Sequence, residues 1–199
     1  PFTGRLSGKY ITNDGKTIIN GITNLKLNAN GTADGCYGLF ACLGTKDKGL
    51  LEGATIENLT VSVIASNFNV ALGANEVSNF GFVAGVNNGT ISNVKVKFNG
   101  NLVVKATKND TQSALGTALV GGISGTNYGI IENSGGITYG AYGIVVDDET
   151  TATVKVGGVC GENHKNIFGQ FVFVGDLLTP SSSETNYNVD YNDETVNSS

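Results

Sequence analysis

The side chains that most often perform chemistry are few and scattered in this chain. It has one histidine, His164, and three cysteines, Cys36, Cys42 and Cys160. A serine–histidine–aspartate triad would have to use His164, which lies in a turn of a degenerate repeat. A zinc site needs three or four ligands, and this spacing provides no such set. We therefore predict no catalytic residue, no cofactor and no metal site, and hence a protein that is not an enzyme.

Two further residue groups bear on carbohydrate or cation chemistry. The densest cluster of carboxylates is Asp147-Asp148-Glu149, which has the oxygen ligands of a hard cation but is more simply a solvated loop. Tyr128, Tyr139 and Tyr142 are the candidates for an aromatic platform that binds sugar. No pair of carboxylates recurs at matched repeat positions, as an outer cleavage groove would require. A carbohydrate-binding or carbohydrate-cleaving protein is therefore the alternative hypothesis.

Composition excludes several other classes. The 199 residues carry a net charge of -5, with 12 basic against 17 acidic side chains, so no basic face for nucleic acid can form. No apolar run approaches the length that spans a bilayer, so we expect no membrane-spanning segment. Hydrophobic residues make up 40% of the chain, which favours a folded domain over disorder. Three scattered cysteines are no disulfide framework.

A short pattern of aliphatic, small, small and aliphatic residues, followed by a turn residue, occurs four times. The copies are 43, 37 and 36 residues apart. The first aliphatic slot holds Phe40, Val83, Val120 and Val156, and the second holds Leu43, Val86, Ile123 and Val159. We expect each set to form one buried column.

A second repeated element has the form Ile-x-Asn-aliphatic, as in Ile91-Ser92-Asn93-Val94. Asparagine can occupy a corner of the backbone and bond to its neighbours along a stack. We therefore expect an asparagine ladder at equivalent corners, in which side chains bond to the backbone of the next coil. Its members are Asn24, Asn58, Asn93 and Asn133.

The repeated elements have the period of strands. Residues 94–98 alternate strictly between apolar and polar, and no segment has a convincing helical period. A unit of this size cannot bury its apolar side alone, whereas a stack of similar units can. The sequence therefore predicts an all-β fold, a β-solenoid of the right-handed parallel β-helix type. A β-sandwich or jelly roll is the alternative.

The chain divides into a repeat-built domain, residues 1–178, and a linker with a C-terminal tail, residues 179–199. In the tail, Tyr187, Val189 and Tyr191 alternate with polar residues, which is the period of a strand. A solenoid ends in unpaired sheet edges that recruit such strands. We expect this assembly strand to dock on a sheet edge, with a slight preference for a second copy of the chain.

Residues 81–94, Gly-Phe-Val-Ala-Gly-Val-Asn-Asn-Gly-Thr-Ile-Ser-Asn-Val, resemble the GLUG repeat of bacterial surface proteins. Residues 119–134 are a second copy, and residues 38–59 resemble the related unit that often precedes such repeats. The resemblance covers roughly residues 1 to 170. It implies a β-helical segment that is secreted or at the cell surface, often within adhesins or beside a protease domain. It brings no catalytic residues.

Secretion would make the glycosylation sequons relevant. The candidate acceptors are Asn30, Asn88 and Asn109, and Asn58 and Asn197 also head sequons. A glycan on Asn58 would conflict with a buried position in the ladder.

The leading hypothesis is a non-enzymatic structural or adhesive protein, secreted or at the cell surface: a spacer, an adhesin segment or a filament subunit. Its expected partners are further copies of itself through the C-terminal strand, or a surface carbohydrate or protein. A third hypothesis is a capping or regulatory domain of a larger surface protease.

Overall fold

The computed structural model describes residues 1–45, 54–109, 115–138, 142–169 and 171–174, which form strands and no helix. Apart from one hairpin, the paired strands run parallel, and each pairs with strands of the coil before or after its own. This confirms the all-β fold and the β-solenoid of the parallel β-helix type, and it excludes the antiparallel sandwich. No helix among the described residues is long and apolar enough to cross a membrane.

Each coil visits four sheets in the same order. The first coil consists of β1 (Arg5–Ser7), β4 (Gly21–Leu25), β5 (Asn28–Gly31), β6 (Cys36–Tyr37) and β7 (Phe40–Leu43). The second consists of β8 (Thr55–Val63), β9 (Ser66–Leu72), β10 (Val77–Gly81) and β11 (Ala84–Asn87). The third consists of β12 (Thr90–Phe98), β13 (Leu102–Lys108), β14 (Thr117–Gly121) and β15 (Ser124–Asn127).

The fourth coil divides its first strand in two. It consists of β16 (Ile130–Glu132), β17 (Gly135–Thr138), β18 (Ile144–Val146), β19 (Thr153–Gly157) and β20 (Cys160–Asn163). The described chain then begins a fifth coil with β21 (Ile167–Phe168) and β22 (Phe171–Val174). A separate hairpin of β2 (Lys9–Ile11) and β3 (Thr17–Ile19) interrupts the first coil.

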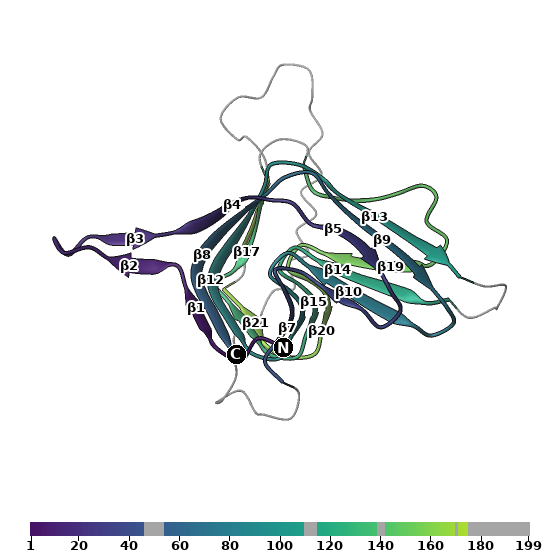
Figure 1. The fold of residues 1–199 in the computed structure, drawn as a ribbon, viewed down its shortest axis with the longest axis horizontal. Coiled ribbons are helices and arrows are strands. Elements are labelled where there is room, and N and C mark those ends of the chain that lie inside the picture. Colours follow the sequence, from purple (N-terminus) through teal and green to yellow (C-terminus); the bar gives the residue numbers. More distant parts are fainter. Residues whose placement is uncertain (46–53, 110–114, 139–141, 170, 175–199) are drawn as a thin grey trace, which may run out of the picture.

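We name the four sheets by their order along the coil. The long sheet contains β1, β4, β8, β12, β16, β17, β21 and β22. The outgoing sheet has the order β5-β9-β13-β18, the returning sheet β6-β10-β14-β19, and the closing sheet β7-β11-β15-β20. Figure 1 shows the outgoing and returning sheets side by side as a wing, with the long sheet on the other side of the molecule.

The core consists of columns of inward side chains that repeat from coil to coil. In the returning sheet the column is Tyr37, Phe80, Val120 and Val156. In the outgoing sheet it is Ala29, Phe68, Val104 and Val146. The rings of Phe68 and Phe80 bridge the two sheets, with centroids 5.2 Å apart. Parallel stacking therefore buries the apolar faces that no single coil could cover.

The predicted register of these columns is wrong for the first three coils. Val83 lies beside Ile123, to whose carbonyl oxygen its N–H donates at 3.0 Å, whereas Val120 pairs with Phe80. Phe40 pairs with Ala84 rather than Val83. Likewise Leu43 pairs with Asn87 and Val86 with Thr126, so the second predicted column also fails there. Only the last step is as predicted: Val120 pairs with Val156, and Ile123 donates to Val159.

Glycine contacts explain the register better than the aliphatic slots do. Gly81, Gly121 and Gly157 are paired with one another, each just before a tight turn. A Cβ at Gly121 would lie 2.0 Å from the carbonyl oxygen of Ser124, so the turn accepts no side chain there. Aliphatic residues lie on both sides of this glycine. An alignment of the repeats that matches only aliphatic residues can therefore pair the wrong ones. Val156 is moreover 43% exposed rather than buried, because it belongs to the last complete coil.

Three of the four predicted ladder asparagines share one corner of the long sheet. Asn58, Asn93 and Asn133 have φ values of 51°, 52° and 46°, and Gly169 continues this position with φ 62°. Only asparagine, aspartate and glycine adopt this left-handed conformation at low cost. The Asn93 amide donates to the Asn58 side-chain oxygen at 2.8 Å, on the outside of the solenoid. The asparagines contact each other there, rather than the backbone of the next coil.

Asn24 is not part of this corner, so its assignment to the ladder is wrong. Its φ is 56°, but it lies inside β4, where the pairing with β8 shifts between Ile22 and Leu25. Gly8 takes the corner position under Asn58, because β1 pairs with the first part of β8 and the chain then leaves the coil to form the hairpin. The inserted hairpin displaces the first Ile-x-Asn unit along the long sheet.

A second asparagine ladder, which the sequence analysis did not predict, lies inside the molecule. Asn87 donates to Asn127 at 2.7 Å, and Asn127 donates to Asn163 at 2.8 Å. Asn87 and Asn127 are fully buried, and their side-chain oxygens accept the N–H groups of Gly89 and Gly129 at the turn into the next coil. This ladder therefore satisfies the backbone of the turns that join the closing sheet to the long sheet.

Replacing the middle asparagine should show what the buried ladder contributes. Asn127→Ala removes the partner of Asn87 and of the Gly129 N–H, and an unsatisfied buried group costs about 1–3 kcal/mol. We expect urea unfolding to show a loss of about 2 kcal/mol or more. The control is Asn67→Ala, an exposed asparagine on the outer side of β9, which should stay within about 0.5 kcal/mol of the parent. Equal losses in both variants would contradict a specific role for the ladder.

Candidate functional site

The polar cluster closest to chemistry surrounds His164. Its Nε2 lies 2.7 Å from a Glu162 oxygen, and the Lys155 Nζ lies 3.0 Å from the other. The imidazole stacks on the Tyr128 ring, with centroids 4.6 Å apart and planes 10° from parallel. The closing sheet positions Glu162, and the turn after β20 positions His164. All of these groups lie at the surface, with exposed fractions between 33% for Glu162 and 54% for Lys155.

The four residues of this cluster include no serine or cysteine that could act as the nucleophile of a catalytic triad. The hydrogen bond from Lys155 lowers the pKa of Glu162, so this carboxylate is ionised at neutral pH and pairs with Lys155 and His164. The nearest thiol is Cys160, whose pKa is raised to about 11 by burial and by the Glu162 charge. A thiol of this pKa carries little thiolate, which is the reactive form. The arrangement fits a surface ion-pair group that ties the returning sheet to the closing sheet.

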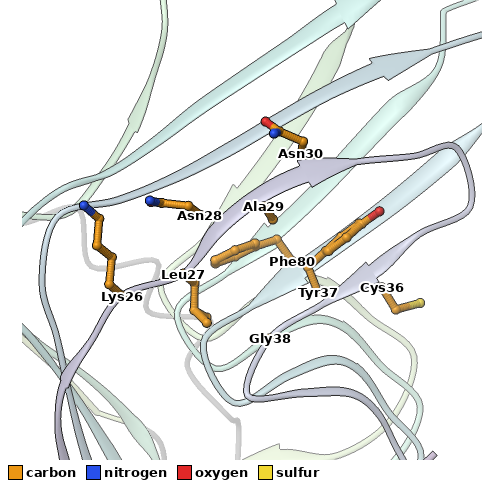
Figure 2. A pocket seen from close by; sticks show the side chains of 9 residues that line it. All are labelled: Lys26, Leu27, Asn28, Ala29, Asn30, Cys36, Tyr37, Gly38 and Phe80. Atoms are coloured by element: carbon orange, nitrogen blue, oxygen red, sulfur yellow. The ribbon is translucent and has the colours of Figure 1, made fainter.

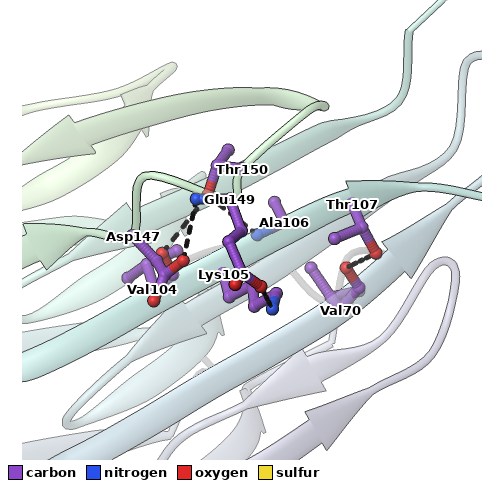
Figure 3. Close-up of polar contacts among 8 residues, drawn as sticks. All are labelled: Val70, Val104, Lys105, Ala106, Thr107, Asp147, Glu149 and Thr150. Atoms are coloured by element: carbon purple, nitrogen blue, oxygen red, sulfur yellow. Dashed lines mark hydrogen bonds and ion pairs between the residues drawn. The ribbon is translucent and has the colours of Figure 1, made fainter.

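The acidic cluster after β18 is organised as a turn rather than as a cation site. The Asp147 carboxylate accepts the Glu149 N–H at 2.9 Å, and Glu149 forms an ion pair with Lys105 on β13 (Figure 3). The side-chain hydrogen bond between Lys105 and Glu149 in this ion pair raises the pKa of Lys105. Among the described residues no group of three or more histidine, cysteine or acidic side chains could hold a metal ion. The carboxylates here position the loop on the outgoing sheet.

The tyrosines proposed as a sugar platform do not lie together. Tyr128 precedes β16 and Tyr142 follows β17, so they occupy opposite ends of the long-sheet strand of the fourth coil. Tyr139 lies outside the described residues. One face of the Tyr128 ring is covered by His164. Tyr128 and Tyr142 therefore form no joint platform for a sugar.

The sequons differ in accessibility. Asn30 on β5 and Asn109 after β13 are exposed. Asn88 is 9% exposed, and its amide donates to the Cys42 sulfur at 3.4 Å. This burial argues against Asn88 as a glycosylation acceptor, because a sugar would have to fit between stacked coils. The assembly strand with Tyr187, Val189 and Tyr191 lies outside the described residues, as does Asn197.

The most exposed apolar element is the hairpin β2–β3, which sequence reasoning missed. It projects away from the body of the solenoid (Figure 1). Tyr10, Ile11, Ile18 and Ile19 are 55%, 59%, 45% and 45% exposed. Tyr10 pairs with Ile18 on one face, and Ile11 and Ile19 lie on the other. A sequence signal existed: two runs of apolar residues flank the turn Asn13-Asp14-Gly15.

Both ends of this hairpin are held firmly. At its base, the Asn20 N–H donates to the Gly8 carbonyl oxygen at 2.8 Å, and the Gly8 N–H donates to that of Glu57 at 3.0 Å. At its tip, the Thr12 N–H donates to the Lys16 carbonyl oxygen at 2.9 Å, and Gly15 supplies a φ of 80°. The hairpin is therefore a formed element anchored on β8, and no other described strand pairs with either of its edges.

A cavity of about 490 Å³ opens at the N-terminal end of the solenoid. It lies between β5 and β6, the first described strands of the outgoing and returning sheets (Figure 2). Its floor is formed by the rings of Tyr37 and Phe80, with Leu27 beside them, while Lys26 and Asn30 lie at its exposed rim. It is the uncovered start of the core columns. No carboxylate of the described chain lines it, and burial raises the pKa of the Cys36 thiol in its lining.

No family model matches this chain, and no curated protein or solved structure matches it either. The resemblance to the GLUG repeat therefore depends on the repeated residues alone. The inference of function has to start from the surfaces of the solenoid.

Burial of Cys160 predicts a slow thiol. With a pKa of about 11, only about one part in a thousand is thiolate at pH 8. We expect alkylation by iodoacetamide to be about a hundredfold slower than for glutathione, and to rise with pH up to about 11. Peptide mass spectrometry follows the modification, and Cys160→Ser identifies the signal. A rate equal to that of glutathione would show that the thiol is neither buried nor perturbed.

Accessibility also predicts the glycosylation pattern in a eukaryotic secretory host. Peptide mass spectrometry should find sugar on Asn30 and Asn109 and none on Asn88, because Asn88 packs against Cys42 between stacked coils. A folded, secreted protein with full occupancy at Asn88 would contradict the packing of the first two coils.

Proposed function

We propose that this chain is a non-enzymatic structural or adhesive protein, secreted or at the cell surface, in which the solenoid is a scaffold and the β2–β3 hairpin makes the intermolecular contact. The observation that carries the proposal is this projecting hairpin with apolar side chains on both faces. The GLUG-like residues of the repeats support the location, since that resemblance implies a surface protein.

The scaffold role follows from how the interior is used. Core columns and the buried asparagine ladder occupy the inside of the solenoid, and among the described residues every buried side-chain nitrogen or oxygen atom has a hydrogen-bond partner. The outer polar groups pair into local ion pairs such as Arg5–Glu57 and Lys155–Glu162. These groups stabilise neighbouring strands and form no converging site. Spacers, adhesin segments and filament subunits need such a framework.

The proposed partner of the hairpin is a second copy of this chain. An isolated two-stranded hairpin is marginally stable in water, and three or more strands with a covered apolar face are needed for stability. The two strand edges of this hairpin and both of its faces are open among the described residues. Two hairpins related by a twofold axis would stack the same face on each other and cover Tyr10 and Ile18 of both copies.

The test is the oligomeric state of the full chain. Size-exclusion chromatography with light scattering and electron microscopy should show a dimer or a larger assembly. The double variant Tyr10→Ser, Ile18→Thr removes one apolar face of the hairpin and should shift the protein to monomer. Its melting temperature should change little, because the hairpin lies outside the core.

The matched control is Val145→Thr. This valine is 42% exposed on the outer face of β18, away from the hairpin. The control should assemble like the parent. A parent protein that stays monomeric at every concentration, or an assembly that the double variant leaves intact, would overturn the self-association proposed for the hairpin.

A further inference from the structure

The C-terminal end of the solenoid is open where its interior columns end. In the outgoing sheet, Val104 is fully buried, but Val146, its partner in the next coil, is 44% exposed. In the returning sheet, Val120 is fully buried, but Val156, its partner, is 43% exposed. These valines face the interior like their partners. They are exposed because no strand lies over them among the described residues.

The long sheet continues one step beyond the other three. β21 pairs with β16 and β22 pairs with β17, so the chain has already started a fifth coil. The outgoing, returning and closing sheets end in β18, β19 and β20, each with a paired neighbour on one side only in the described chain. In the order of the coil, the positions that follow β22 are therefore those over these three open edges.

The spacing of the earlier coils shows where a further returning-sheet strand would begin. In each coil we count from the end of the long-sheet strand to the start of the returning-sheet strand. The counts are 11 residues after Leu25, 14 after Val63, 19 after Phe98 and 15 after Thr138. The same spacing counted from Val174 reaches residues 185–193. This window contains the alternating segment with Tyr187, Val189 and Tyr191.

We propose that residues 187–191 add to β19 of the same molecule as a parallel strand and close the C-terminal end of the solenoid. In the register that pairs Tyr191 with Val156, Val189 lies over Val154, and these side chains extend the interior columns. The offset of 35 residues is close to the 36 residues that separate Ile131 from Ile167 in the long sheet.

This register also suits the outer face of the strand. It places Asp190 opposite Lys155, which gives a cross-strand pair of opposite charge. Residues 175–199 contain five acidic and no basic side chains, and polar residues alternate with the apolar stripe. A terminal unit with a polar outer face is what a solenoid needs at its end. A closed edge also stops unwanted strand addition.

The same molecule is a better host than a second copy. β22 lies in the fifth coil, so a short connection brings the strand beside β19, and this connection gives a high effective concentration. The slight preference of the sequence analysis for a second copy rested on an exposed edge alone. The open end of the core next to the last described strand now favours closure within one chain.

Hydrogen exchange on the full chain tests this directly. We expect the amides of residues 187–191 to exchange at least about tenfold more slowly than in an unstructured peptide, to the same extent at low and high protein concentration. Exchange at the unstructured rate would overturn the proposal. Protection that grows with concentration would instead identify a second copy as the host.

A pair of matched variants provides the second readout. Replacing Tyr187, Val189 and Tyr191 by serine should lower the melting temperature and speed hydrogen exchange of the β19 amides. The control replaces Asn186, Asn188 and Asn192 by serine in the same segment. It should leave the melting temperature and the exchange rate in β19 unchanged. Equal behaviour of the two triple variants would show that the apolar stripe covers nothing. The hairpin variants do not affect this readout, so the two proposals fail independently.

Discussion

Apart from the hairpin, the described strands of each coil pair only with strands of the coils before and after it, and the rest of the structure depends on that arrangement. A coil by itself has no ladder and no covered apolar face. Stability therefore comes from matching one coil to the next, residue by residue. The rings of Phe68 and Phe80 and the aliphatic columns above them are the apolar part of this match. The buried ladder of Asn87, Asn127 and Asn163 is the polar part.

The two asparagine columns perform different physical tasks. The inner column accepts turn N–H groups and connects coil to coil by amide hydrogen bonds in a dry environment, where a missing partner is costly. The outer column of Asn58, Asn93 and Asn133 occurs where the long strand needs a left-handed residue, and Gly169 replaces asparagine at the next coil. The outer position is thus selected by backbone conformation, and the inner one by hydrogen bonding.

The sequence predicted the architecture because repetition and period-two alternation are properties of the chain itself. Strands such as β8 and β12 and the corner with Asn58 and Asn93 follow directly from them. The register failed at Phe40 and Val83, since close backbone contacts at Gly81 and Gly121 fix it, and these depend on neighbouring coils. Two further effects are not local in sequence: an insertion moved Asn24 away from the corner, and stacking buried Asn88.

The ends of a solenoid decide how it can associate, because an open end invites another stack and a covered end prevents it. At the start of the chain, the Phe2 N–H donates to the Cys42 carbonyl oxygen, and the Phe2 ring lies 4.5 Å from that of Phe40, so part of the first coil is covered. If the last coil is closed by its own chain, end-to-end growth is blocked there. Contacts between molecules then fall to the side of the stack, where the chain leaves the first coil at Gly8 to form the hairpin. The β2–β3 hairpin, which interrupts the repeat in the first coil, would thus be the element through which the solenoid contacts a second copy.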